Sequence, residues 1–185
     1  MKRACRPVIV SIEEAGALFR IWGCNDTLFP MKGKMSLWVH AWSGPPRWER
    51  VVCVSLPANT SGVVAEILKA DLPSLGLDAV LVADLKAGKQ GDRAWYFAGL
   101  PCRMRPPAVE LTVRREARKG KREAVIIKAD SYARVVTLEA DVAFSDNYFD
   151  LLPGEERRIE WIGKLSEADP LLIRCWNGRT AVRIS

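Results

Sequence analysis

The sequence predicts an all-β protein made of two tandem immunoglobulin-like β-sandwiches of about seven strands each. Three observations support this prediction. Apolar side chains recur at every second position in most segments, which is the period of a half-buried strand. Turn-forming residues separate these segments at intervals of about 8–12 residues. No segment shows a long, clean helical period of about 3.6 residues.

The first set of strands occupies residues 1–100, and turn-forming pairs such as Asn25-Asp26 end these strands. The segment 50–56 is a continuous apolar strand. The segment 63–72 is the best helix candidate, and we favour a strand that runs into a turn there. The predicted strands of this set are 8–13, 19–22, 33–42, 50–56, 62–68, 79–85 and 93–99.

A proline-rich segment, 101–107, divides the chain. Its three prolines cannot continue a hydrogen-bonded ladder, so we interpret it as a linker between domains 1–100 and 108–185. In the second domain, the sequence LLPG at 151–154 predicts a type II turn with its Pro-Gly pair at the centre. The predicted strands of this domain are 108–114, 122–129, 133–140, 146–151, 155–161, 170–176 and 180–185.

The chain start and the cysteines predict the compartment. The first residues, MKRACRPVIVS, lack the sustained apolar run of a signal peptide, and no later stretch approaches the ~18 apolar residues of a membrane span. We therefore expect a cytoplasmic location and no membrane partner. The five cysteines are widely spaced without a CxxC pair, so we expect free, mostly buried thiols in a reducing compartment.

Much of the net charge of +6 comes from the segment RREARKGKRE at 114–123, which holds six basic and two acidic residues. Such a patch could bind the phosphate groups of a nucleic acid. The segment has neither a helical pattern nor interleaved aromatic residues, so we favour a solvated hairpin loop around Gly120. Nucleic acid is accordingly not expected as a partner.

Enzyme signatures are absent from the sequence. His40 is the only histidine, and it lies between two tryptophans in an alternating strand, which favours packing or a surface role over catalysis. Metal sites need clustered ligands, and the cysteines are scattered. The glutamates, such as Glu13 and Glu155, lie at strand ends or turns, where solvated charge is usual. We therefore expect no catalytic residue, no metal ion and no cofactor.

The strand 33–42 carries the first candidate site. Its core face consists of Met35, Leu37, Val39 and Ala41. Its other face holds Trp38, His40 and Trp42, spaced about 7 Å apart along the strand. Uncovered indoles form an apolar patch that marks a contact surface. We expect this row to meet a neighbouring domain, a second copy or a partner chain. Stacking on the pyranose rings of an oligosaccharide is the alternative.

The segment FSDNYFDLLPGE at 144–155 closely resembles the last domain of β-mannosidases and related exo-acting glycosidases. The order and spacing of three further segments support the resemblance along essentially the whole chain: RPVIVSIEE…IWGCND (6–26), SLPANTSGVVAEI (55–67) and VLVADL…GDRAWYFAG (80–99). The resemblance implies the last two modules of a long enzyme whose (β/α)8 barrel carries two catalytic glutamates. The general acid/base of that family is a Glu directly after an Asn, and this sequence contains no Asn-Glu pair.

The resemblance therefore implies a non-catalytic C-terminal accessory portion of a β-mannosidase-like glycosidase, either a fragment or a separate subunit. Its partner would be a catalytic barrel chain or a second copy of itself, and its task would be to buttress the barrel. The alternative is a free-standing carbohydrate-binding module, because exposed members of the seven tryptophans could stack on sugars.

We expect the segment 144–161 to fold as a hairpin with a structural role. Phe149 and Leu151 fall on one strand face, and burying such side chains contributes about 1.5–3 kcal/mol each. The alternative is that Asp146, Asn147 and Tyr148 form a loop that reaches the active-site mouth of a partner barrel. These three residues are the second candidate site.

Overall fold

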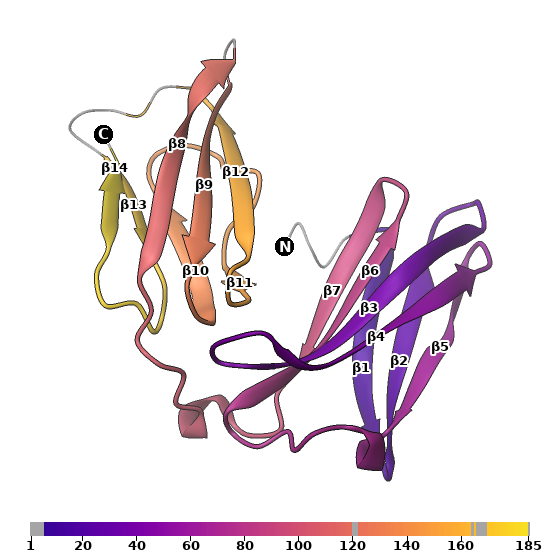
Figure 1. The fold of residues 1–185 in the computed structure, drawn as a ribbon. Helices are drawn as coiled ribbons and strands as arrows, with labels where there is room; N and C mark the ends of the chain where they lie inside the picture. Colours follow the sequence, from indigo (N-terminus) through magenta and orange to yellow (C-terminus); the bar gives the residue numbers. More distant parts are fainter. Residues whose placement is uncertain (1–5, 120–121, 164, 166–169, 185) are drawn as a thin grey trace. The chain divides into compact units, whose positions relative to one another are not determined.

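The computed structural model describes residues 6–119, 122–163, 165 and 170–184. The all-β prediction is confirmed, because the described helical segments are the two 3-10 turns Lys69–Asp71 and Pro101–Arg103. The chain divides into two compact units (Figure 1). The first sandwich comprises Met1–Ala41 and Pro45–Met104, and the second comprises Trp42–Gly44 and Arg105–Ser185.

Within residues 6–104, the described part of the first sandwich forms seven strands, as the alternation predicts. They are β1 (Val8–Ala15), β2 (Leu18–Asn25), β3 (Met31–Ala41), β4 (Pro46–Leu56), β5 (Thr60–Leu68), β6 (Ala79–Ala87) and β7 (Gln90–Tyr96). One sheet has the order β1-β2-β5 and the other β4-β3-β6-β7, and all their pairs are antiparallel. The strand β5 runs directly into a 3-10 turn, so the preference for a strand over a helix at 63–72 is confirmed.

The core of the first sandwich lies between the inward rows of its two sheets. On β3 the side chains of Met35, Leu37 and Val39 are fully buried, which confirms three members of the predicted core face, whereas Ala41, the fourth, is half-buried. The strand β4 lies at the edge of its sheet and alternates between core and solvent, with Val54 4% and Val51 61% exposed. The strand β6 lies inside that sheet and is buried along both faces.

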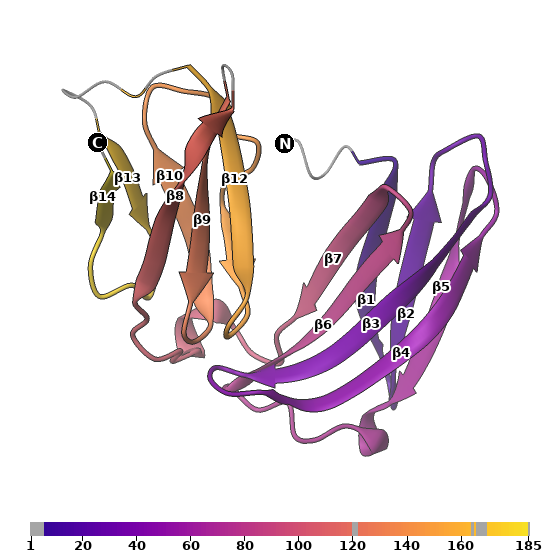
Figure 2. The same ribbon diagram turned by 45° about the horizontal axis from the view of Figure 1, so that its top comes forward.

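The described residues of the second sandwich also form seven strands. They are β8 (Leu111–Lys119), β9 (Arg122–Ala129), β10 (Ala133–Glu139), β11 (Phe149–Leu151), β12 (Glu156–Ile162), β13 (Leu171–Arg174) and β14 (Val182–Ile184). One sheet has the order β12-β9-β8 and the other β11-β10-β13-β14. Figure 2 shows β8, β9 and β12 side by side in the first of these sheets. The core holds buried apolar residues from both sheets, such as Ile127 and Ile173.

The prediction of a hairpin at 144–161 is wrong. β11 pairs with β10, whereas β12 pairs with β9 in the other sheet. The Pro-Gly corner therefore carries the chain from one sheet to the other. The corner is a type II turn, as predicted, because Glu155 N–H donates to the Leu152 carbonyl at 3.0 Å and Gly154 has φ +76°. Both strands bury apolar residues in the same core from opposite sides, so they cannot pair with each other.

The prediction that the cysteines are mostly buried is wrong for the described part of the chain. Cys24 and Cys175 are half-buried, and Cys53 and Cys102 are exposed. Cys53 projects outward from the edge strand β4, and Cys102 lies in a 3-10 turn. Cys5 lies outside the described residues.

The basic segment 114–123 lies on the β8–β9 hairpin, whose strands pair as far as Lys119 and Arg122. The tip that we predicted around Gly120 lies outside the described residues. No helix in the described part of the chain is long and apolar enough to cross a membrane.

Candidate functional site

Trp38 and His40 lie on the outward face of β3. Their rings meet edge to face, with centroids 6.3 Å apart. The guanidinium carbon of Arg93 lies 5.9 Å from the centroid of Trp38 and 5.5 Å from that of Trp95 on β7. Arg93 is oriented by Asp84 on β6, whose carboxylate accepts from its Nε at 3.0 Å. Side chains of the same sheet therefore pack over the Trp38 ring.

Trp42 belongs to the second compact unit, and its ring stacks on that of Tyr132. Its ring centroid lies 4.8 Å from that of Tyr132 at an interplanar angle of 30°, and its carbonyl accepts the Tyr132 N–H at 2.7 Å. Only 6% of Trp42 and 7% of His40 are exposed. An indole so enclosed has no face on which a sugar ring can stack. The role of the row Trp38, His40 and Trp42 stays a prediction, both as a contact site and as its sugar-binding alternative, and burial argues against stacking only at Trp42.

Asp146 and Asn147 are engaged within the second sandwich. The Asp146 carboxylate pairs with Arg157 at 2.8 Å and accepts the Asn147 N–H at 2.9 Å. The Asn147 amide accepts the Leu138 N–H at 2.9 Å and donates to the Leu138 carbonyl at 2.8 Å. The side chain thus takes the place of one residue in a β-ladder at the edge of β10. Their role in a loop toward a barrel stays a prediction.

Asp150 makes hydrogen bonds to a strained part of the same sheet. Its carboxylate accepts the Tyr132 hydroxyl at 2.7 Å and the Val135 N–H at 2.7 Å. Val135 has φ +48°, a conformation that is rare for a β-branched residue. Burial, and then the Asp150 carboxylate, raise the pKa of the Tyr132 phenol far above its ordinary value. This cluster is part of the framework of the fold.

Tyr148 is the one member of the second candidate site that faces solvent, with 69% of its surface exposed. Trp176, 61% exposed, lies in the turn after β13, and sequence reasoning did not select it. The Asn-Gly pair that follows Trp176 is the signal that could have identified a turn projecting an indole.

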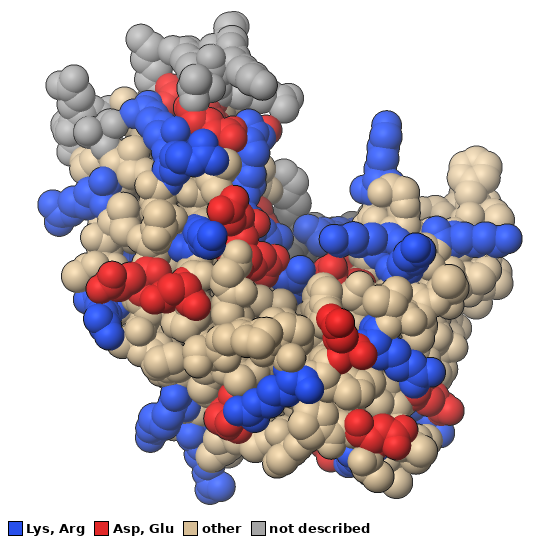
Figure 3. All heavy atoms as spheres, viewed as in Figure 1, with Lys and Arg blue, Asp and Glu red and all other residues tan. Residues whose placement is uncertain are grey.

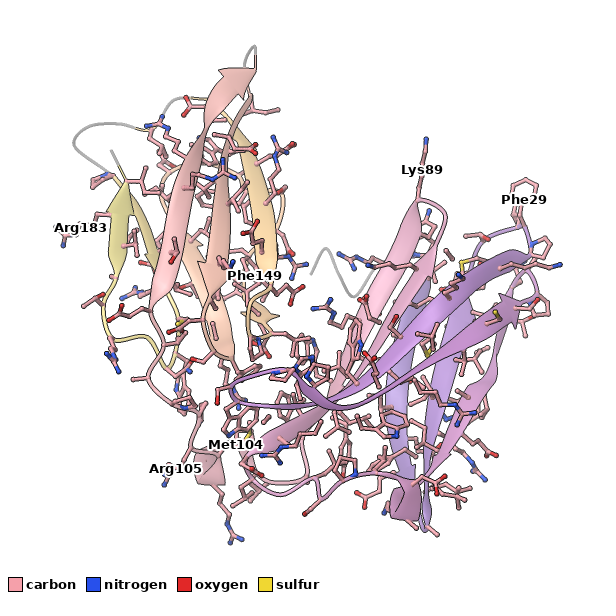
Figure 4. The ribbon with its side chains drawn as sticks, viewed as in Figure 1. Phe29, Lys89, Met104, Arg105, Phe149 and Arg183 are labelled. Carbon is pink, nitrogen blue, oxygen red and sulfur yellow. The ribbon has the colours of Figure 1, made fainter. Side chains whose placement is uncertain are left out.

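The loop between β2 and β3 presents two further apolar side chains that sequence reasoning missed. Leu28 and Phe29 are 76% and 75% exposed, and Figure 4 shows Phe29 directed away from the sandwich. The fully buried Asn25 fixes the loop by donating to the carbonyls of Phe29 and Pro57, both at 2.9 Å. The side-chain oxygen Oδ1 of Asn25 accepts the Thr27 N–H at 3.1 Å. The loop is therefore preorganised.

Charged side chains of both signs are mixed over the visible face of the molecule (Figure 3). On the basic hairpin, Arg115 pairs with the buried Glu123, and Glu116 accepts from Arg158 at 2.6 Å. Such pairing weakens the attraction of this hairpin for phosphate groups. No three ligand-type residues in the described ranges are close enough to hold a metal ion.

Two protein families match the chain. Residues 18–100 match a family described as the Mannosidase Ig/CBM-like domain, and residues 104–172 match the Ig-fold domain named Ig_mannosidase. No curated protein matches the chain in sequence.

Solved structures share the fold. The β-D-mannosidase of Dictyoglomus thermophilum matches 98% of this chain with 23% identity and a TM-score of 0.84, and the match covers 23% of that enzyme. The exo-chitosanase CsxA of Amycolatopsis orientalis matches 99% of this chain with 14% identity and a TM-score of 0.63, over 27% of its length. The chain thus spans 23–27% of the lengths of these enzymes.

Proposed function

Since both sandwiches are immunoglobulin-like domains of the β-mannosidase type, we propose that this chain is the non-catalytic C-terminal portion of a β-mannosidase-like glycosidase. The observation that carries the proposal is the order of the two domain types along essentially the whole chain. The remaining part of such an enzyme would supply the catalytic barrel, and these sandwiches would buttress it. The chain would be either a fragment or a separately encoded subunit.

Catalysis is not assigned to this chain alone. The resemblance places the general acid/base on a Glu that follows an Asn, and the four asparagines here precede Asp, Thr, Tyr and Gly. The purified chain should therefore leave aryl β-mannosides intact. Hydrolysis that survives rigorous purification and disappears when one Glu of this chain is replaced would contradict the proposal.

Contact with the catalytic portion would use the loop that presents Leu28 and Phe29. Two adjacent exposed apolar side chains are a common mark of a contact surface. The buried Asn25 already holds them outward, so little conformational entropy is lost when the loop docks. The catalytic portion is the expected occupant, because the matched enzymes are roughly four times as long as this chain.

The coding sequence directly upstream of this chain tests the proposal first. A β-mannosidase-type barrel in frame, or in a neighbouring reading frame, is the expected result. Its absence would contradict the proposed function.

Reconstitution tests the contact. The barrel portion and this chain, expressed together, should co-purify, and the joint replacement of Leu28 and Phe29 by Ser should weaken the complex at least tenfold. Val51→Ser is the matched control, because Val51 is similarly exposed on β4 but lies outside the loop. Equal weakening by the control would show that the loop has no special role.

A further inference from the structure

The outward face of the β11-β10-β13-β14 sheet combines aromatic and charged side chains. Pairing of Thr137 with Arg174, and of Glu139 with Leu172, brings these four residues to that face. Leu172 in turn pairs with Arg183 of β14, which Figure 4 shows directed away from the strand. The intervening residues of β10 and β13 are buried in the core. We call this surface the open face and include Tyr148 and Trp176, which border it.

Trp176 is held rigidly at the border of the open face. Its N–H donates to the Arg134 carbonyl at 2.8 Å, and Gly178 N–H closes the turn on the Cys175 carbonyl at 3.1 Å. The next residue, Asn177, donates to the carbonyls of Pro107 and Tyr132, both at 2.8 Å. These bonds fix the backbone of Trp176, and the Arg134 guanidinium packs on its ring, so the indole loses less entropy when a ligand stacks on it than it would on a mobile loop.

Tyr148 is also held in place. Its N–H donates to the Asn147 side chain at 2.9 Å, and its backbone has φ +57°. The register places Tyr148 level with Thr137 and two strands from Trp176. From strand spacing and rise, the Cα atoms of Tyr148 and Trp176 are about 12 Å apart. A few linked pyranose rings span that distance.

Charged groups lie between and beside the two aromatic residues. Arg174 donates from Nε to the Glu139 carboxylate at 3.0 Å, and the Arg134 guanidinium carbon lies 5.6 Å from the centroid of Trp176. An open hollow of about 420 Å³ adjoins them, lined by Glu139, Ala140, Pro170, Leu172 and Arg183. The open face therefore offers stacking surfaces, a carboxylate, guanidinium groups and a concavity.

This combination suits a sugar better than a protein surface. Covering an ion pair such as Arg174–Glu139 with apolar protein costs desolvation energy. Sugar hydroxyls, in contrast, can donate to the carboxylate and accept from the guanidinium, while the apolar face of a pyranose stacks on an aromatic ring. Arg134, Arg174 and Arg183 lie on this face, and the described carboxylates of Glu139 and Asp150 are already engaged by Arg174 and by the Val135 N–H, so a cationic sugar such as glucosamine would be repelled.

We propose that the open face of the second sandwich binds a neutral oligosaccharide, with Trp176 and Tyr148 as the two stacking platforms. Arg174, Glu139 and Arg183 supply the hydrogen bonds to hydroxyl groups. This site is separate from the row that contains Trp38. It also goes beyond the accessory role and does not depend on it, since binding requires only the second sandwich.

Calorimetric titration of the full chain with mannohexaose, cellohexaose and the hexamer of glucosamine tests this site. We expect binding of at least one neutral hexamer and weaker binding of the glucosamine hexamer. Trp176→Ala should raise the Kd at least tenfold, Tyr148→Ala should raise it severalfold, and Trp176→Phe should restore part of the affinity. Phe29→Ala removes an equally exposed aromatic ring elsewhere and should leave the Kd unchanged.

Three results would overturn the proposal. They are no binding of either neutral hexamer at millimolar concentration, parental affinity in Trp176→Ala, and tightest binding of the glucosamine hexamer. Thermal unfolding of each variant distinguishes a lost contact from a lost fold, and we expect parental midpoints because both rings are exposed. A negative titration would leave the accessory role standing, since co-purification with a barrel portion tests that role separately.

Discussion

The row at 38–42 and the segment at 144–155 are the two regions that the sequence marks as candidate sites, and they reach opposite outcomes. In the row, the aromatic Trp42 is covered, because it stacks on Tyr132. In the segment, the polar residues Asp146 and Asn147 are engaged by Arg157 and by the backbone, whereas the aromatic Tyr148 is exposed.

This difference shows that polarity alone does not identify the side chains available to a ligand. A polar group at the edge of a sheet satisfies unpaired backbone groups, and each such bond contributes about 1 kcal/mol. An aromatic ring is covered only where another part of the chain supplies a surface for it. Four predictions test this contrast, in order of decreasing effect.

The largest effect should come from Phe149, next to Tyr148 in the chain. Phe149 is 1% exposed in the core, so Phe149→Ala should lower the free energy of unfolding by about 3–5 kcal/mol. Tyr148→Ala should change it by less than about 0.5 kcal/mol. Urea denaturation followed by circular dichroism measures both. Equal losses of unfolding free energy in the two variants would mean that Tyr148 is buried in solution.

Trp42 should contribute more to stability than Trp38. Trp42→Ala removes a buried ring that stacks on Tyr132 and should cost about 2–3 kcal/mol. Trp38 is half-buried beneath Arg93, so Trp38→Ala should cost about 1 kcal/mol or less. Thermal unfolding compares the two variants. A larger loss of stability in Trp38→Ala would contradict the prediction that the more buried tryptophan contributes more.

Replacing Asn147 should lower stability by a smaller amount, because it removes two hydrogen bonds from its side chain to the backbone. Asn147→Ala leaves the N–H and carbonyl of Leu138 without their side-chain partner and should cost about 1–2 kcal/mol. Thr137→Ala is the matched control, because Thr137 lies on the same strand β10 and its hydroxyl makes only a long hydrogen bond of 3.4 Å to the Arg174 carbonyl. If the two variants lost the same stability, the two bonds of Asn147 to Leu138 would have no special role.

Alkaline pH should destabilise both sandwiches through two phenols, that of the half-buried Tyr96 and that of the fully buried Tyr132. Burial, and then Glu14, raise the pKa of Tyr96 from 10 to about 12, and the pKa of Tyr132 is raised further by burial and Asp150. The unfolded chain therefore releases these protons first, so stability is fully present below pH 10 and falls as the pH rises to 12.

Urea midpoints measured across that range test the effect. Tyr96→Phe and Tyr132→Phe should each make the fall with pH shallower than in the parent, whatever their effect at neutral pH. A fall as steep as the parental one in both variants would exclude the two phenols as its origin.

The comparison also separates what sequence can predict about a site from what it cannot. The alternation predicted that Trp38 and His40 lie on the face of β3 opposite Met35, Leu37 and Val39, and in the structure they lie on that face. It could not reveal that Arg93, from a strand more than fifty residues away, packs over Trp38. Trp176 was missed for a related reason, because it follows the last alternating residue of β13 and its exposure depends on the turn.

The sequence by itself determined the strands, their inward faces, the type II turn at Pro153-Gly154 and the resemblance to β-mannosidase-type domains. All of these depend on local periodicity, turn chemistry or short motifs. Only the tertiary structure decided that β11 and β12 lie in different sheets, that Trp42 is covered by Tyr132, and that Asn147 completes the edge of β10. These outcomes depend on which distant segments pair and pack, and long-range pairing leaves no signal in the local pattern of side chains.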